Sequence, residues 1–254
     1  MKFTGRNISV SPTAKIADSA RIGDGSTIYD NVVIDEGVVI GNDCVIGEPQ
    51  SSYYENADYV NPATRIGCDS LIRSHSIIYS DVNVGAGFSC GHRVTIREGS
   101  RFGVHCRLGT NGDVQANIEV GDHCWFHSGV FLAAGTVVGD FVLVYPHVIM
   151  LDDKMPPSRD LHPVTISDYA QIGAGACVTP GVKVKSHALV GSGAVVTKDV
   201  AEYTCVVGNP AKHVKDVRDM KLEDGSPAYP WPYRFDRGMP WEGLGFDEWK
   251  RQQK

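Results

Sequence analysis

The sequence lacks the features that would place the protein in a membrane or on nucleic acid. No apolar run approaches the roughly 18 residues that a membrane span needs. The net charge is −6 over 254 residues, so no broad basic surface for nucleic acid is present. No apolar core of the signal-peptide type follows the first six residues, Met1-Lys-Phe-Thr-Gly-Arg. We therefore expect a cytoplasmic protein without nucleic-acid or membrane partners.

The seven cysteines are an odd number, are scattered, and include no CxxC pair. This usage predicts reduced thiols in place of a disulfide framework. Glycine, in contrast, is abundant: the chain has 28 of them, which indicates many turns.

An apolar residue recurs at every sixth position through three blocks of the chain, residues 10–46, 66–144 and 166–196, which together hold 27 such positions. The residue four places further on is small or β-branched almost throughout, with Gln50 and Phe88 as exceptions. Each group of six therefore predicts a short strand with one large and one small inward residue, followed by a turn. Three such strands make a coil of 18 residues, and stacked coils bury a continuous core.

This pattern resembles the hexapeptide-repeat, left-handed parallel β-helix. The resemblance covers about residues 8–212 and implies an all-β solenoid of about nine coils. The left-handed coiling is implied by the resemblance alone, because parallel crossovers are usually right-handed. We expect a β-helix domain over residues 1–212. Residues 213–254 are rich in Pro, Tyr and Trp and are expected to form a C-terminal cap or packing arm.

The period of six fails twice, near residues 49–64 and 151–164. These segments do not fit a coil, so we expect them to protrude as two loops. Loops on a rigid scaffold often carry binding and catalytic residues. A tolerated insertion is the other interpretation of each break.

The sequence of the last repeats resembles that of acyl-CoA-dependent hexapeptide acyltransferases. It reads Ile172-Gly-Ala-Gly-Ala, then Val190-Gly-Ser-Gly-Ala, then Val207-Gly-Asn-Pro-Ala-Lys. In that family the cofactor lies along the outside of the C-terminal coils, between two subunits of a trimer. The resemblance implies these cofactor-binding residues: Gly173, Ala174, Gly191, Ser192, Lys198, Asn209 and Lys212. The alternative interpretation is a set of tight turns with solvated lysines.

Further segments resemble one branch of the nucleotide-sugar N-acyltransferases, the dTDP-4-amino-4,6-dideoxyglucose N-acyltransferase type. They are Ile46-Gly-Glu-Pro, the tyrosine-rich first loop and the Tyr-Pro-Trp…Met-Pro-Trp-Glu-Gly tail. The second loop resembles the Asn-Asp-x-x-Pro loop of nucleotide-sugar N-acyltransferases in general, with Asp152 in place of Asn. The resemblance implies acyl-CoA as co-substrate, a dTDP-linked amino sugar as acceptor, and a homotrimer. The candidate substrate-binding residues are Tyr53, Tyr54, Asn56, Asp152, Asp153 and Arg93.

The implied reaction is attack of a sugar amine on a thioester, which needs a neutral amine and a stabilised oxyanion. An extended pantetheine arm, on the order of 20 Å, spans about four coils at a strand spacing of about 4.8 Å. Counting back from the last repeats places the thioester near residues 105–130. The candidates for the base or for orienting the substrate are His123, His127, Asp113 and His92. Proton loss to water, with no enzyme base, is the alternative.

Three other functions remain open at this point. A UDP-N-acetylglucosamine O-acyltransferase using acyl-carrier protein shares some wording, but residues 131–136 read Phe-Leu-Ala-Ala-Gly-Thr where its His-x-x-His-Asp-Cys hallmark would fall. A γ-type carbonic anhydrase and a non-catalytic scaffold are the others. We expect no metal, because the 18-residue register directs His105 and His123 outward, while Cys106 and Cys124 point inward.

Overall fold

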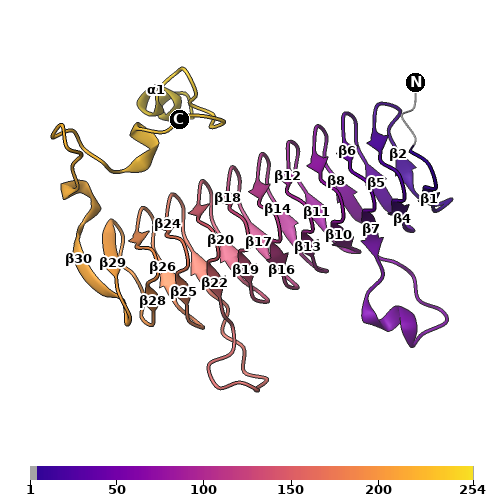
Figure 1. Ribbon diagram of the computed structural model, residues 1–254, viewed down its shortest axis with the longest axis horizontal. Coiled ribbons are helices and arrows are strands. Elements are labelled where there is room, and N and C mark those ends of the chain that lie inside the picture. Colours follow the sequence, from indigo (N-terminus) through magenta and orange to yellow (C-terminus); the bar gives the residue numbers. More distant parts are fainter. Residues whose placement is uncertain (1–4, 254) are drawn as a thin grey trace.

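The computed structural model describes residues 5–253, and its main body is a β-helix of three parallel sheets (Figure 1). Face 1 contains β1 (Ser9–Val10), β4 (Thr27–Ile28), β7 (Val45–Glu48), β10 (Ile77–Tyr79), β13 (Thr95–Ile96), β16 (Asp113–Val114), β19 (Phe131–Leu132), β22 (Ile149–Met150), β25 (Cys177–Val178) and β28 (Val195–Val196). Face 2 contains β2 (Lys15–Ile16), β5 (Val32–Ile34), β8 (Thr64–Ile66), β11 (Asn83–Val84), β14 (Arg101–Phe102), β17 (Glu119–Val120), β20 (Val137–Val138), β23 (Thr165–Ile166) and β26 (Lys183–Val184). Face 3 contains β3 (Arg21–Ile22), β6 (Val39–Ile40), β9 (Leu71–Ile72), β12 (Ser89–Cys90), β15 (Arg107–Leu108), β18 (Trp125–Phe126), β21 (Leu143–Val144), β24 (Gln171–Ile172), β27 (Leu189–Val190), β29 (Thr204–Val207) and β30 (Lys212–Asp216).

Residues 18 apart pair between neighbouring coils, as Ile78 pairs with Ile96. The sixth-position residues fill the interior; Ile46 and Ile78 are fully buried. Phe88, an exception to the small-residue rule, is also fully buried and lies against Phe102. The expected left-handed parallel β-helix is confirmed.

Each coil turns at three edges, and most turns hold a residue with a left-handed backbone. Glycine adopts this conformation freely, and Asn, Asp and His are the next most frequent there. The edge between faces 3 and 1 comprises residues 23–25, 41–43, 73–75, 91–93, 109–111, 127–129, 145–147, 173–175 and 191–193; we call it the glycine edge. The edge between faces 2 and 3 is called the aromatic edge, after its column of His105, His123, Phe141, Tyr169, His187 and Tyr203.

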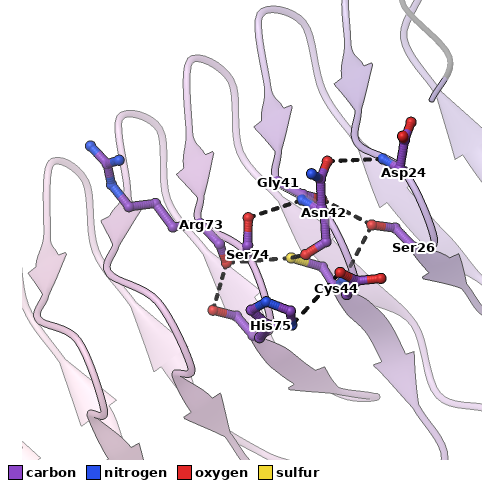
Figure 2. Close-up of polar contacts among 10 residues, drawn as sticks. Asp24, Ser26, Gly41, Asn42, Cys44, Arg73, Ser74 and His75 are labelled. Carbon is purple, nitrogen blue, oxygen red and sulfur yellow. Dashed lines mark hydrogen bonds and ion pairs between the residues drawn. The ribbon is translucent and has the colours of Figure 1, made fainter.

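Side-chain oxygens join successive coils along the glycine edge (Figure 2). The Oδ1 of Asn42 accepts the backbone N–H of Asp24 at 3.0 Å, and the Oγ of Ser74 accepts that of Asn42 at 3.1 Å. A Cβ added at Gly41 would lie 2.6 Å from the backbone nitrogen of Ser74. The coils therefore stack so closely here that glycine is needed for packing.

Both interruptions of the period protrude from the edge between faces 1 and 2, which we call the loop edge (Figure 1). The first follows β7, contains η1 (Ser51–Tyr54), and ends where β8 begins. The second lies between β22 and β23. Because β7 and β22 are five strands apart in face 1, the loops are separated by about 24 Å along the axis.

The C-terminal segment caps the solenoid and then folds back over face 3. Its first strand, β30, pairs antiparallel with β29. It continues through η2 (Val217–Asp219) and η3 (Trp231–Tyr233) to α1 (Phe246–Gln252). A second hydrophobic cluster joins the arm, residues 213–253, to the β-helix; its buried members are Phe141, Leu143, Trp231, Met239, Trp241 and Phe246.

Candidate active site

The glycine edge brings together candidates that are distant in sequence. His92 and Arg93 follow β12, His127 follows β18, and Gly173 and Ala174 follow β24, each at this edge. Gly191 and Ser192 occupy the same position one coil beyond Gly173. Asn209 follows β29, and Lys212 pairs with Val207 across the turn that contains Asn209. Two catalytic candidates, His92 and His127, and most of the cofactor-binding candidates therefore share one line along the solenoid.

His127 has the environment of a neutral imidazole. Its ring stacks on Tyr145, with centroids 5.2 Å apart and planes 6° apart. Partial burial lowers the pKa of His127 below its ordinary value of 6.5. At neutral pH this imidazole is therefore unprotonated and able to accept a proton.

His123 lies on the aromatic edge, across face 3 from His127. It has φ 55° and its ring is stacked between His105, at 5.0 Å, and Phe141, at 5.2 Å. Burial lowers the pKa of His123, and the nearby His105 lowers it further. Its Nδ1 is buried and has no hydrogen-bond partner within residues 5–253. The expected stacking of His105 under His123 is confirmed.

Arg93, His92 and Asp113 are one to two coils away from His127. Arg93 donates from Nε to Asn111 Oδ1 at 2.9 Å, which fixes the guanidinium along the edge. His92 has an exposed side chain. Asp113 lies on face 1, where its Oδ1 accepts from Gln115 Nε2 at 2.9 Å.

The candidates in the two loops are on a different edge from His127. Tyr53, Tyr54 and Asn56 are exposed in the first loop, and Tyr53 and Tyr54 contact edge-to-face at 5.2 Å. In the second loop Asp153 accepts from Ser158, and this hydrogen bonding lowers the pKa of Asp153. Asp153 thereby holds its own loop together.

Asp152, the other candidate in this loop, accepts the backbone N–H of His162 at its carbonyl. Since face 1 separates the loop edge from the glycine edge, one chain alone does not bring Tyr54 or Asp152 beside His127.

The glycines of the last coils have two different structural roles. A Cβ at Gly173 would lie 2.5 Å from the backbone nitrogen of Ser192, so coil stacking alone requires glycine there. Gly175 and Gly193, at φ 68°, would place a Cβ in open space. The edge is therefore bare at these two positions, whereas the equivalent Asn111 and His147 carry side chains. Lys198 follows β28 and lies at the loop edge, away from this bare stretch.

Reasoning from the sequence missed the contribution of the arm. Trp125, Tyr145 and Gln171 of face 3 line a cavity with Tyr229 and Trp231 of the arm. The only signal in the sequence was Gln171, a glutamine between leucines in the outward row of face 3.

Metal-ligating side chains do not gather in the described part of the chain. Among residues 5–253, no three His, Cys, Asp or Glu side chains are grouped so that they could hold a metal ion. Cys106 and Cys124 are fully buried, and their Sγ atoms face backbone carbonyls. Within the same residues no helix has the length and apolar character of a membrane span.

Comparison with known proteins agrees with this repeat architecture. The family description "Bacterial transferase hexapeptide (six repeats)" matches residues 5–48. A 2,3,4,5-tetrahydropyridine-2,6-dicarboxylate N-acetyltransferase of Ligilactobacillus salivarius is 58% identical over 62 residues, which are 24% of this chain and 26% of the relative. Serine acetyltransferase 1, chloroplastic, of Arabidopsis thaliana is 35% identical over 121 residues, 46% of this chain and 37% of the relative.

The chain thus spans less than two thirds of the length of these curated relatives. A crystal structure of a UDP-N-acetylglucosamine acyltransferase superposes with a TM-score of 0.52 at 20% identity, covering 83% of this chain and 72% of the other. At that identity the likeness concerns the fold alone. The match to the transferase hexapeptide description is confined to residues 5–48, and these repeats are part of a left-handed parallel β-helix.

Proposed function

We propose that this protein is an acyltransferase that moves an acyl group from acyl-CoA to an amine of a nucleotide-linked sugar. The observation that carries the proposal is the line from His127 to Asn209 along the glycine edge. Four strand steps separate β18 from β29, or about 19 Å, which matches an extended pantetheine arm on the order of 20 Å. The bare positions Gly175 and Gly193 lie between them.

In this arrangement the pantetheine arm lies over Gly175 and Gly193, and Lys212 meets a phosphate. The thioester then lies beside His127. The amine nitrogen attacks the thioester carbon, and its carbonyl oxygen becomes an oxyanion. Collapse of this intermediate breaks the carbon–sulfur bond and releases the CoA thiolate. The neutral imidazole of His127 accepts the proton that the amine loses.

The acceptor in this proposal is a dTDP-linked 4-amino-4,6-dideoxyhexose. This choice is supported by the sequence resemblance of the two loops and the C-terminal arm to nucleotide-sugar N-acyltransferases. The loop residues Tyr53, Tyr54, Asn56 and Asp152 contact the nucleotide sugar from a neighbouring subunit of a homotrimer. The separation of the loop edge from the glycine edge in one chain supports a site made by two chains.

The test is an assay of thiol release. Purified protein is mixed with acetyl-CoA or longer acyl-CoAs and with dTDP- or UDP-linked amino sugars, and the freed thiol is followed spectroscopically. We expect release that depends on the dTDP-linked 4-amino sugar. Release only with an acylated carrier protein, or only with an amino-acid acceptor, would refute the proposed substrates. No release with any amine would overturn the enzyme assignment.

A further inference from the structure

The arm and face 3 enclose a cavity of about 410 Å³, within the range of small-molecule sites. Its floor is formed by Trp125, Leu143 and Gln171 on three successive strands of face 3. Its cover is formed by Tyr229, Trp231 and Phe235 of the arm. The Nε1 of Trp231 donates to the backbone oxygen of Tyr169 at 3.0 Å, and this bond holds the cover on the β-helix.

Gln171 is the unusual residue of this cavity. Its strand neighbours in face 3 are Leu143 and Leu189, and only 6% of its surface is exposed. Within residues 5–253 no hydrogen bond joins its side-chain amide to the protein, and the amide atoms keep some exposed surface in the cavity that they line. An amide in a nearly buried side chain that has no partner in the chain offers a donor and an acceptor to whatever fills the cavity. Its position at the floor of a cavity therefore points to a ligand that supplies the missing bonds.

A second polar group at the same floor is also unpaired. The Nε1 of Trp125 is buried and has no partner in the described residues. The ring of Trp125 lies edge-to-face against Phe235 at 5.4 Å, and the guanidinium of Arg107 lies over it at 4.0 Å. The indole is thus fixed in place by its neighbours, with one donor free.

The chemistry of the lining matches a nucleobase. A primary amide offers a donor and an acceptor side by side, which is the pattern that pairs with the edge of a base. Aromatic side chains provide surfaces on which a base stacks. Arg234, at the rim, is held by bonds from Nη1 to Ser226 and to the carbonyl of Pro227, and its remaining N–H groups suit a phosphate.

We propose that this cavity binds the base of a nucleotide substrate, and that Gln171 pairs with the edge of that base. The inference rests on the proposed function for the source of the base, the nucleotide sugar, since a CoA laid along the glycine edge has its adenosine near Lys212 and away from this cavity. Gln171 lies two strands from His127 in face 3, about 10 Å along the axis. A base at Gln171 therefore leaves room for the diphosphate and sugar to extend toward His127, which lines the same cavity.

The test measures nucleotide binding by calorimetry, without any turnover. The probes are dTDP, UDP, 3′-phosphoadenosine 5′-diphosphate and base-free pyrophosphate. The variant is Gln171→Leu, which continues the leucine row, and the control is Leu189→Met, one coil beyond the cavity. We expect at least one nucleotide to bind more tightly than pyrophosphate, and Gln171→Leu to weaken it about tenfold or more, with no change in Leu189→Met.

The outcome distinguishes the sources of the base as well as the proposal itself. Loss confined to dTDP or UDP supports the nucleotide sugar as the source of the base, and loss confined to the adenosine probe would overturn both that source and the placing of CoA along the glycine edge. Equal affinity of wild type and Gln171→Leu, or no preference for a nucleotide over pyrophosphate, overturns the proposal. If Gln171→Leu does not fold, as judged by circular dichroism, Gln171→Asn shortens the amide and replaces it.

Failure of this inference is distinguishable from failure of the proposed function. If the protein binds dTDP through Gln171 but releases no thiol, the inference about the cavity stands and the proposed function fails. If the protein acylates the amino sugar but Gln171→Leu leaves nucleotide affinity unchanged, the proposed function stands and the inference about the cavity fails.

Discussion

His127 and Tyr145 lie one coil apart on the glycine edge with their rings stacked, 5.2 Å between centroids and 6° between planes. The stack fixes the imidazole at the edge and removes part of its surface from water. Partial burial lowers the pKa of His127, so the ring is neutral at the pH at which an amine nucleophile is also partly neutral. This relationship gives the first prediction.

Replacement of His127 by Asn should lower kcat by about 10²-fold or more, because a positioned base contributes that much. The low-pH limb of wild-type kcat should have its midpoint below pH 6.5, since burial lowers the pKa of His127 and its protonated form accepts no proton. A pH series of kcat for both proteins checks this. Tyr145→Phe is the control, because it keeps the ring. The same low-pH limb in His127→Asn would remove His127 as the base.

Replacement of Gly193 by Asn should raise the KM for acyl-CoA about tenfold while leaving Tm unchanged. Gly193 has φ 68° and open space around its Cβ position, and Asn111 adopts the same conformation on the same edge. The new side chain therefore fits the backbone but occupies the bare stretch. Gly225→Asn, in the arm and equally open, is the control. An unchanged KM would show that the pantetheine arm does not lie there.

Gly173→Ala should behave in the opposite way and destabilise the protein. Its Cβ would meet the backbone nitrogen of the next coil at 2.5 Å, and such overpacking costs about 1–3 kcal/mol. Comparison of the Tm of Gly173→Ala with that of Gly193→Asn distinguishes a glycine needed for coil packing from a glycine at an open position. Equal Tm values for Gly173→Ala and the wild type would contradict the close approach of the coils.

Trp241→Ala should release the arm without unfolding the β-helix. Trp241 is fully buried and contacts Phe141 and Phe246, so truncation is expected to cost about 3–5 kcal/mol. Limited proteolysis should cleave after residue 212, while the far-ultraviolet circular dichroism is retained. Leu244→Ala, at an exposed position of the arm, is the control. Protection equal to wild type would mean that other contacts hold the arm.

Mixed oligomers should restore activity if two chains form each site. Tyr54→Ala changes the loop edge and His127→Ala changes the glycine edge, and each alone should be inactive or weak. Co-expression of the two variants then gives some sites with both residues intact. Light scattering should report a trimer. Activity no greater than that of the separate variants, or a monomeric protein, would contradict a shared site.

The period of six predicted the β-helix because it is a local pattern. Each group of six contributes its own inward residues, so the coil register, the two loops and the stacking of His105 under His123 follow by counting. Gln50 appeared as an exception to the inward rule because the chain has already left the coil there, after β7. The resemblance supplied the handedness, which the period does not contain.

The cavity under the arm could not be found by counting. The arm has no repeat, and its contacts with face 3 join residues far apart in sequence, as Trp231 joins Tyr169. Gln171 lies between Leu143 and Leu189 in its row, but its burial depends on the position of the arm. Likewise, the period placed Gly173 and Gly175 on one edge. Only the distances to the next coil show that Gly173 is needed for packing and that Gly175 lies at an open position.

The antiparallel pairing of β30 with β29 also sets the length of the solenoid. Every earlier strand in face 3 offers the next coil the same parallel pattern of donors and acceptors, so in principle growth could continue without limit. β30 reverses that pattern and presents charged side chains, Lys212, Lys215 and Asp216, instead of another apolar step. At this end the strand therefore replaces the parallel edge that another coil would need with an antiparallel edge that carries charged side chains, which disfavours end-to-end association.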